Sequence, residues 1–171
     1  MAYEFKLTRL VEFSDTDMAG IVHFTAFFYY MEQAEHAFYR SLGLSVVMEN
    51  EDQHISWPRV RASCDYRKPL RFEDEVEIHL IVREKKAKAI VYEFAFRKVK
   101  GKGQGPGPKD QGAEARAKSA SDAAEEVARG ELVVVCITKE KGSDTMRSIN
   151  IPAVIADRID EAPREMLAKK D

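Results

Sequence analysis

The sequence is poor in the residues that build covalent and metal-bound frameworks. Its 171 residues include only two cysteines and four histidines. Cys64 and Cys136 lie inside apolar, strand-like runs without CxxC spacing, so we expect buried free thiols rather than a disulfide or a metal site. The histidines are scattered without ligand spacing, and we therefore expect no metal centre.

The sequence also lacks long apolar runs and an excess of either charge. No apolar stretch reaches the length that spans a bilayer, and the first ten residues do not have the layout of a signal peptide. There are 27 lysines and arginines against 29 aspartates and glutamates, a formal net charge of -2. This balance favours neither nucleic acid nor membrane as a partner, so we expect a cytoplasmic protein in which any anion site is local.

The patterns that are present indicate one α+β domain. A chain of this length suits a single domain with a sizeable core. Loose alternation predicts a strand at 3–13, and helical spacing predicts a helix at about 25–42 that ends at Gly43. Alternating or continuous apolar patterns then predict four more strands, at about 56–67, 75–84, 88–99 and 131–140.

The predicted helix is apolar on most of its sides. Residues recur at helical spacing along one face at Phe27, Met31, Ala34, Phe38 and Leu42. Aromatic residues also occupy much of the opposite face: Phe24, Phe28, Tyr29, Tyr30 and Tyr39. Because such a helix needs apolar cover on several sides, we expect it to be wrapped by strands rather than laid on a surface.

The segment between the last two predicted strands has the composition of an insertion. Residues 100–130 begin with glycine, proline and lysine and continue with alanine, glutamate and arginine, without an apolar stripe. We expect a flexible insertion, dispensable for folding and turnover, within a single domain that spans 1–171. A role as a substrate lid or as a partner-binding segment stays open.

The turn before the helix, at 14–20, contains two aspartates one residue apart. A carboxylate there lies near the positive end of a helix dipole, where free backbone N–H groups can also hold an oxyanion. Both features serve acyl transfer. Asp15 or Asp17 can equally satisfy the N–H groups of the turn, which is the commoner role of an aspartate before a helix.

The stretch DTDMAGIVHF, followed by FFYYMEQAEHAFYRSLG, resembles the entry segment of hotdog-fold acyl-CoA thioesterases of the 4-hydroxybenzoyl-CoA thioesterase type, including their YbgC-like branch. The resemblance continues more weakly through WPRVRASCDYRKPLRFEDEV and INIP. Residues 100–130 have no counterpart in compact members, and His23 stands where an aromatic residue or asparagine is more usual. The resemblance implies a hotdog fold, in which an antiparallel sheet of about five strands wraps around a long central helix.

The same resemblance implies hydrolysis of acyl-CoA thioesters to the free acid and coenzyme A. It implies that Asp17 is catalytic and that the backbone N–H of Phe24 is the oxyanion donor, with Gly20 and Val22 in register with the family motif. Asp17 would act as a nucleophile or as a general base toward water, and both routes stay open. No cofactor is expected beyond the coenzyme A of the substrate. Family sites form between subunits, so we expect a homodimer or homotetramer.

Polar residues near the motif are further candidates for contact with the substrate. His23 could orient water or the thioester carbonyl, although a histidine beside a helix start is as often structural. Glu32 could face the acyl group, or it could belong to a polar line of i,i+4 pairs with His36. Glu32 and Glu35 are also the rivals of Asp17, because helix carboxylates are the catalysts of a different thioesterase branch.

Three arginines are candidates for the phosphates of coenzyme A. Arg59, Arg61 and Arg67 alternate with apolar residues and are predicted to share one strand face. Guanidinium groups bind phosphate well, but a solvated sheet face gives the same pattern.

Two other functions stay open. A hotdog hydratase or dehydratase would act on the same thioesters but needs a base at the acyl α or β carbon, and no matching histidine motif is visible. A non-catalytic acyl-CoA-binding protein would use the same pocket without turnover, with the insertion available to a partner.

Overall fold

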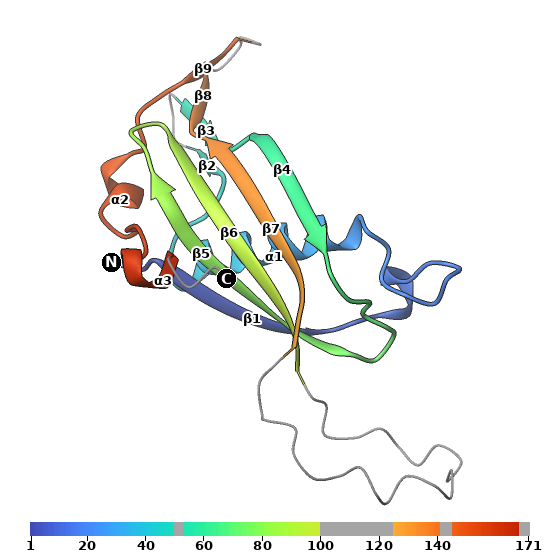
Figure 1. Ribbon diagram of the computed structural model, residues 1–171. Coiled ribbons are helices and arrows are strands. Elements are labelled where there is room, and N and C mark those ends of the chain that lie inside the picture. Colours follow the sequence, from blue (N-terminus) through green and yellow to red (C-terminus); the bar gives the residue numbers. More distant parts are fainter. Residues whose placement is uncertain (50–52, 100–124, 141–144, 168–171) are drawn as a thin grey trace, which may run out of the picture.

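The computed structural model describes residues 1–49, 53–99, 125–140 and 145–167 (Figure 1). In chain order the elements are β1 (Glu4–Leu10), η1 (Phe13–Asp15), α1 (Ala26–Ser41), β2 (Met48–Glu49), β3 (Gln53–Ser56), β4 (Arg59–Tyr66), β5 (Glu75–Lys85), β6 (Ala89–Val99), β7 (Glu125–Val135), β8 (Ile137–Glu140), β9 (Met146–Ser148), α2 (Ala153–Ala156) and α3 (Arg164–Leu167).

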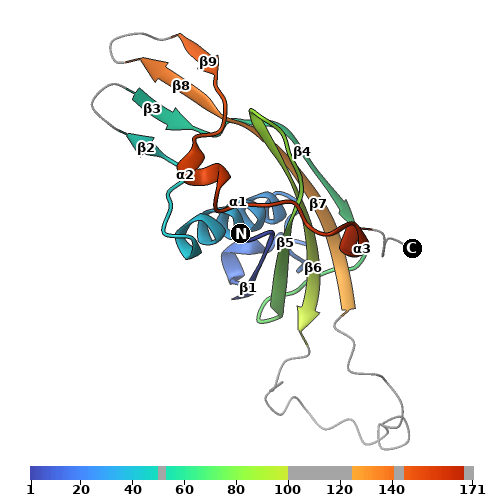
Figure 2. The same cartoon turned by 90° about the vertical axis from the view of Figure 1, so that its left-hand side faces the viewer.

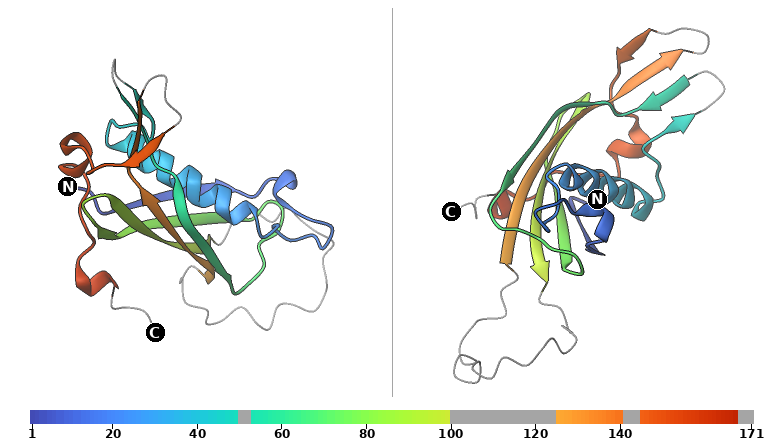
Figure 3. Two further views of the ribbon diagram at one scale, coloured as in Figure 1. Left: turned by 90° about the horizontal axis from the view of Figure 1, so that it is seen from above. Right: turned by 90° about the vertical axis from the view of Figure 1, so that its right-hand side faces the viewer.

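Five strands form the main sheet, in the order β1-β5-β6-β7-β4, and every neighbouring pair is antiparallel. The sheet curves around α1, which lies against its concave face (Figures 2 and 3). This arrangement confirms the predicted α+β hotdog fold, a five-stranded antiparallel sheet around one long helix.

The core lies between α1 and the concave face of the sheet. The predicted helical face is buried, since Phe27, Met31, Ala34 and Phe38 are at most 3% exposed. Alternate residues of the strands complete this core, among them Val76, Ile78, Leu80, Val82, Tyr92, Phe94 and Phe96. The residues between them, such as Glu77, His79 and Glu93, lie on the other face because successive side chains of a strand point to opposite faces.

The cover on α1 is less complete than the sequence predicts. Tyr30 and Tyr39 are buried, but Phe24, just before the helix, and Tyr29 are 58% and 63% exposed. One side of the helix is therefore open within a single chain. The chain's own strands do not cover the aromatic residues on that side.

A second, smaller sheet has the order β2-β3-β8-β9 and lies at one end of the main sheet (Figures 1 and 2). Its strands are two to four residues long, too short for a periodic pattern to predict. The helix α3 lies on the opposite side of the main sheet from α1 (Figure 2).

The predicted boundaries of the insertion and of the last strand are wrong at one end. Residues 125–130 were expected in the insertion but form the first half of β7, which continues to Val135. The predicted strand at 131–140 is divided between β7 and β8. Residues 100–124 of the expected insertion lie outside the described residues. Pairing with β6 and β4 makes a strand of the polar stretch EEVARG, because tertiary pairing overrides weak local preference.

The strand β4 is an edge of the main sheet, and its residues are exposed except for the partly buried Cys64. The prediction that Arg59 and Arg61 share one strand face is wrong, since Arg59 contacts Glu35 and Arg61 contacts Glu131. An irregularity in the pairing between Arg59 and Arg61 marks a β-bulge, which changes the face to which following side chains point. Arg59 and Arg61 therefore do not share a face.

Both cysteines are free thiols, as predicted, with Cys136 buried and Cys64 partly buried. Burial raises the pKa of both thiols to about 11. No helix among the described residues is long and apolar enough to cross a membrane. Within the same residues, no group of three or more histidine, cysteine, aspartate or glutamate side chains could hold a metal ion.

Candidate active site

Asp15 ties the turn to the elements on both sides of it. Its Oδ2 accepts hydrogen bonds from the Tyr30 hydroxyl at 2.9 Å and from the backbone N–H of Glu12 at 3.0 Å. The guanidinium of Arg9, on β1, lies 3.2 Å from the same oxygen. The backbone carbonyl of Asp15 accepts the N–H of His23 at 2.8 Å. One carboxylate thus connects β1, the turn and α1.

Asp17 is exposed on the same turn and has fewer contacts. Its Oδ1 accepts the N–H of Ala19 at 2.8 Å. Its backbone carbonyl accepts the N–H of Gly20, whose φ of 71° closes the turn in the left-handed region that glycine adopts without strain. Within the described part of the chain, no hydrogen-bond donor contacts Oδ2 of Asp17. This oxygen is available to a substrate or a water.

An open groove of about 460 Å³ begins at Asp17. Its walls are mostly apolar or aromatic, and two basic residues, Arg67 and Lys68, follow the end of β4. Besides Asp17 and these two, the lining residues are Ile21, Val22, Phe24, Phe27, Tyr66, Pro69 and Leu70. The groove crosses two segments far apart in sequence, which the hydrogen bond from the N–H of Val22 to the carbonyl of Leu70, at 2.8 Å, holds together.

Phe24 lies on this groove, two residues before the first residue of α1. No acceptor for its backbone N–H is found among the described residues. Its backbone carbonyl accepts the Tyr66 hydroxyl at 3.0 Å. A free N–H near the N-terminus of a 16-residue helix lies where the helix dipole favours negative charge.

The other residues of the predicted motif have different surroundings. Gly20 shapes the turn and does not line the groove, whereas Val22 is 5% exposed and does. His23 is also outside the groove lining, and its Nδ1 lies 2.7 Å from the Thr25 hydroxyl. The structure therefore brings Asp17, Val22 and Phe24 together and leaves Gly20 and His23 beside them.

Glu32 and Arg59 belong to a separate polar cluster between α1 and β4. Arg59, on β4, lies 3.2 Å from Glu32 and 2.6 Å from the fully buried Glu35. His36 is 4.0 Å from Glu32, the predicted i,i+4 pair. None of these side chains lines the groove.

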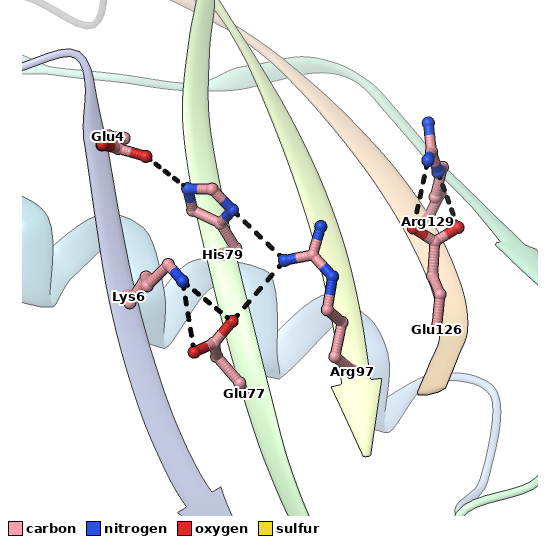
Figure 4. A network of polar contacts seen from close by, with 7 residues as sticks. All are labelled: Glu4, Lys6, Glu77, His79, Arg97, Glu126 and Arg129. Carbon is pink, nitrogen blue, oxygen red and sulfur yellow. Dashed lines mark hydrogen bonds and ion pairs between the residues drawn. The ribbon is translucent and has the colours of Figure 1, made fainter. Parts of the chain in front are cut away.

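Arg61 lies on the convex face of the sheet, away from α1. There it lines a second hollow of about 490 Å³ and is 3.5 Å from Glu131. Figure 4 shows the polar residues that cross this face, with α1 behind the sheet. His79 connects Glu4, 2.7 Å from its Nε2, to Arg97, 3.4 Å from its Nδ1. The charges on this face are largely paired with one another.

Sequence reasoning missed the part of the groove that comes from 66–70. The stretch YRKPL follows an alternating strand and ends it with a proline, and its Arg67 is a candidate for the phosphates of coenzyme A, but nothing in it predicts a place beside the turn. Its place beside the turn depends on long-range pairing, which no local pattern encodes. The local sequence feature that could have indicated a binding role for this stretch is the pair of basic residues, Arg67 and Lys68, next to Tyr66.

A family model described as the thioesterase-like superfamily matches residues 11–169. The chain belongs to the thioesterase-like superfamily. A provisionally named esterase of Aquifex aeolicus is 38% identical over 76 residues, 44% of this chain and 59% of the relative. A 1,4-dihydroxy-2-naphthoyl-CoA hydrolase of Trichodesmium erythraeum is 31% identical over 77 residues, 45% of this chain and 56% of the relative. The chain therefore spans less than two thirds of the length of these relatives.

Solved structures similar to this thioesterase-like chain show the fold that it shares. A gentisyl-coenzyme A thioesterase has a TM-score of 0.63 at 24% identity, covering 89% of this chain and 99% of that one. The 4-hydroxybenzoyl-CoA thioesterase of Pseudomonas sp. strain CBS-3 has a TM-score of 0.65 at 16% identity, covering 91% and 99%. At these identities the likeness is one of fold.

Proposed function

We propose that this member of the thioesterase-like superfamily hydrolyses acyl-CoA thioesters to the free acid and coenzyme A. One observation supports this most directly. The same groove is lined by Asp17, which has a free carboxylate oxygen, and by Phe24, which has an unpartnered backbone N–H. A thioester has a good leaving group, so one carboxylate and one oxyanion donor can suffice.

Two routes are compatible with this arrangement. In the first, a carboxylate oxygen of Asp17 attacks the carbonyl carbon, the C–S bond breaks, and coenzyme A leaves as the thiolate. Water then hydrolyses the mixed anhydride and restores Asp17. In the second, Asp17 takes a proton from the water that attacks the same carbon. In both, the N–H of Phe24 donates to the developing oxyanion.

We also propose that the active form is at least a dimer, joined along β4. Edge strands present unpaired N–H and C=O groups, and β4 has Val60 61% exposed and Tyr66 47% exposed. The open side of α1 adds the exposed Phe24. A second copy over this region would cover the apolar surface and close the groove against water.

Aromatic acyl groups are the first substrates to test. Phe24, Phe27 and Tyr66 line the groove, and aromatic walls favour planar apolar groups. Several relatives are named 1,4-dihydroxy-2-naphthoyl-CoA hydrolases. The walls are also compatible with a medium-length aliphatic acyl group.

A panel of aromatic, short and long acyl-CoA thioesters, assayed for release of free thiol, tests the proposal. Hydrolysis predicts thiol release with at least one acyl class, and loss of that release in Asp17→Asn. Hydration without thiol would indicate a hydratase, and binding without turnover would indicate an acyl-CoA-binding protein. Either result would contradict the proposed function.

A further inference from the structure

We propose that Tyr66 is a positioning residue that holds the backbone of Phe24 in place for the oxyanion. This inference rests on the proposed function, because it assigns a task to a hydrogen bond beside the proposed oxyanion donor. Tyr66 lies 42 residues after Phe24, on the edge strand β4, and its hydroxyl donates to the Phe24 carbonyl at 3.0 Å.

Phe24 has little else to hold it. Its side chain is 58% exposed, and among the aromatic rings of the described residues it pairs with the neighbouring His23 ring, at 4.5 Å between centroids. Its N–H has no acceptor among the described residues. Its carbonyl precedes the hydrogen-bond ladder of α1, where the N–H of Phe28 donates instead to the carbonyl of Thr25. Within the described parts of the chain, the Tyr66 hydroxyl therefore supplies the one hydrogen bond to Phe24.

Tyr66 is itself held by the core. Its ring packs edge-on against Phe27, with centroids 5.2 Å apart and planes at 68°. Phe27 in turn packs edge-on against Phe96, on β6, at 5.1 Å. Such pairs restrict the ring, so the hydroxyl meets the carbonyl without further ordering of the side chain.

The hydroxyl of Tyr66 also stays a donor over the pH range of an assay. Burial raises the pKa of this hydroxyl to about 12, with smaller contributions in the same direction from the Cys64 thiol and the Asp65 carboxylate on β4. A neutral phenol can donate one hydrogen bond and Cys64 can donate weakly to it, so the donation to Phe24 is compatible with both contacts.

Tyr66→Phe keeps the ring and the groove wall but removes the hydrogen bond. A hydrogen bond of this kind changes an equilibrium or rate constant by about threefold to tenfold. We therefore expect kcat to fall about three- to tenfold, while KM changes less than about twofold. Tyr3→Phe is a matched control, since no hydrogen bond of its hydroxyl is found among the described residues and it is not on the groove. Its kcat should equal that of the wild type.

A carbonyl ¹³C spectrum adds a readout that does not depend on turnover. Loss of the hydrogen bond should move the Phe24 carbonyl resonance in Tyr66→Phe and not in Tyr3→Phe. Thermal melting and sedimentation should match the wild type. Unchanged kcat, an unchanged Phe24 resonance, or a kcat loss explained by a lost dimer would each overturn the role of Tyr66 alone. A wild-type chain that hydrolyses no thioester would overturn the proposed function and, with it, this role.

Discussion

Asp15 and Asp17 lie one residue apart, but their carboxylates have opposite surroundings. Asp15 receives Tyr30, Arg9 and the Glu12 N–H on one oxygen. Asp17 is exposed and uses one oxygen for the N–H of Ala19. A carboxylate whose oxygen already accepts three donors is a poor nucleophile or base, because those donors engage the lone pairs and the negative charge that would attack carbon or take a proton. The contacts of the two carboxylates therefore favour a catalytic role for Asp17 and a structural role for Asp15.

Asp15→Ala should destabilise the fold more than Asp17→Ala. The first variant leaves the buried Tyr30 hydroxyl without its acceptor, which costs about 1–3 kcal/mol, whereas the exposed Asp17 loses one turn contact. Urea unfolding of both variants measures the difference. Equal losses, or a larger loss for Asp17→Ala, would contradict the structural role of Asp15.

Glu35 is a buried carboxyl whose ionisation opposes folding. Burial raises its pKa from 4.5 to about 7, although the Arg59 guanidinium acts in the other direction. Because the folded state holds this proton more tightly than the unfolded chain, the stability due to Glu35 is full below pH 4.5 and is lost as the pH rises to about 7.

Glu35→Gln should remove this pH dependence. Between about pH 5 and pH 8, the wild type should lose about 1–3 kcal/mol of unfolding free energy relative to the variant. Urea unfolding at both pH values, at one protein concentration, gives the comparison. Glu84→Gln, at a side chain 45% exposed that is not among the charges acting on Glu35, is the control and should keep the slope of the wild type. A wild-type-like slope in Glu35→Gln would show that another group is responsible.

At the scale of elements, the packing of α1 on β7 leaves no space for a side chain at Gly130. A Cβ added to Gly130 would lie 2.3 Å from Sδ of the buried Met31. The sequence predicted Met31 on the core face of the helix, but it could not predict the glycine opposite, because Gly130 lies in a polar stretch that resembles a loop. Contacts between distant elements decide such positions.

Gly130→Ala should therefore destabilise the domain by about 1–3 kcal/mol, since the core must shift to admit the methyl group. In a Met31→Ala background, Gly130→Ala should lower the free energy of unfolding much less, because the space of the Met31 side chain is already empty. A double-mutant cycle measured by thermal melting tests this coupling. Additive effects of the two substitutions would contradict the packing described.

The elements also show how far the sequence predicts this structure. The helical spacing of α1 predicted that helix and its core face, and the apolar patterns of β5 and β6 predicted those two strands, because the period of the apolar residues is visible in the sequence. Alternation in β4 predicted a strand but not its edge position or the bulge near Val60. The sequence predicted the part of the candidate site that lies in the turn, because the turn has a local motif. It did not predict the part at 66–70, because strand pairing between distant segments brings Tyr66 and its neighbours to the turn.

At the scale of the whole molecule, the exposed edge β4 and the open side of α1 predict a dimer. Val60→Glu should weaken self-association at least tenfold, because it places a charge on apolar surface that a partner would cover. Val154→Glu, at a valine 44% exposed on α2, is the matched control and should leave association unchanged. Sedimentation over a range of concentrations measures both, and a monomeric wild type would contradict the shared interface.

Thiol release by Asp17→Asn is the most direct test of whether Asp17 carries the chemistry. The substitution keeps the size of the side chain and the acceptor for Ala19 but removes the charge, so kcat should fall roughly a hundredfold or more with melting and oligomer size unchanged. Asp15→Asn, Glu32→Gln and Glu35→Gln should each retain far more activity. Near-normal kcat in Asp17→Asn, together with loss of activity in Glu32→Gln or Glu35→Gln, would contradict the account and place the chemistry on the helix.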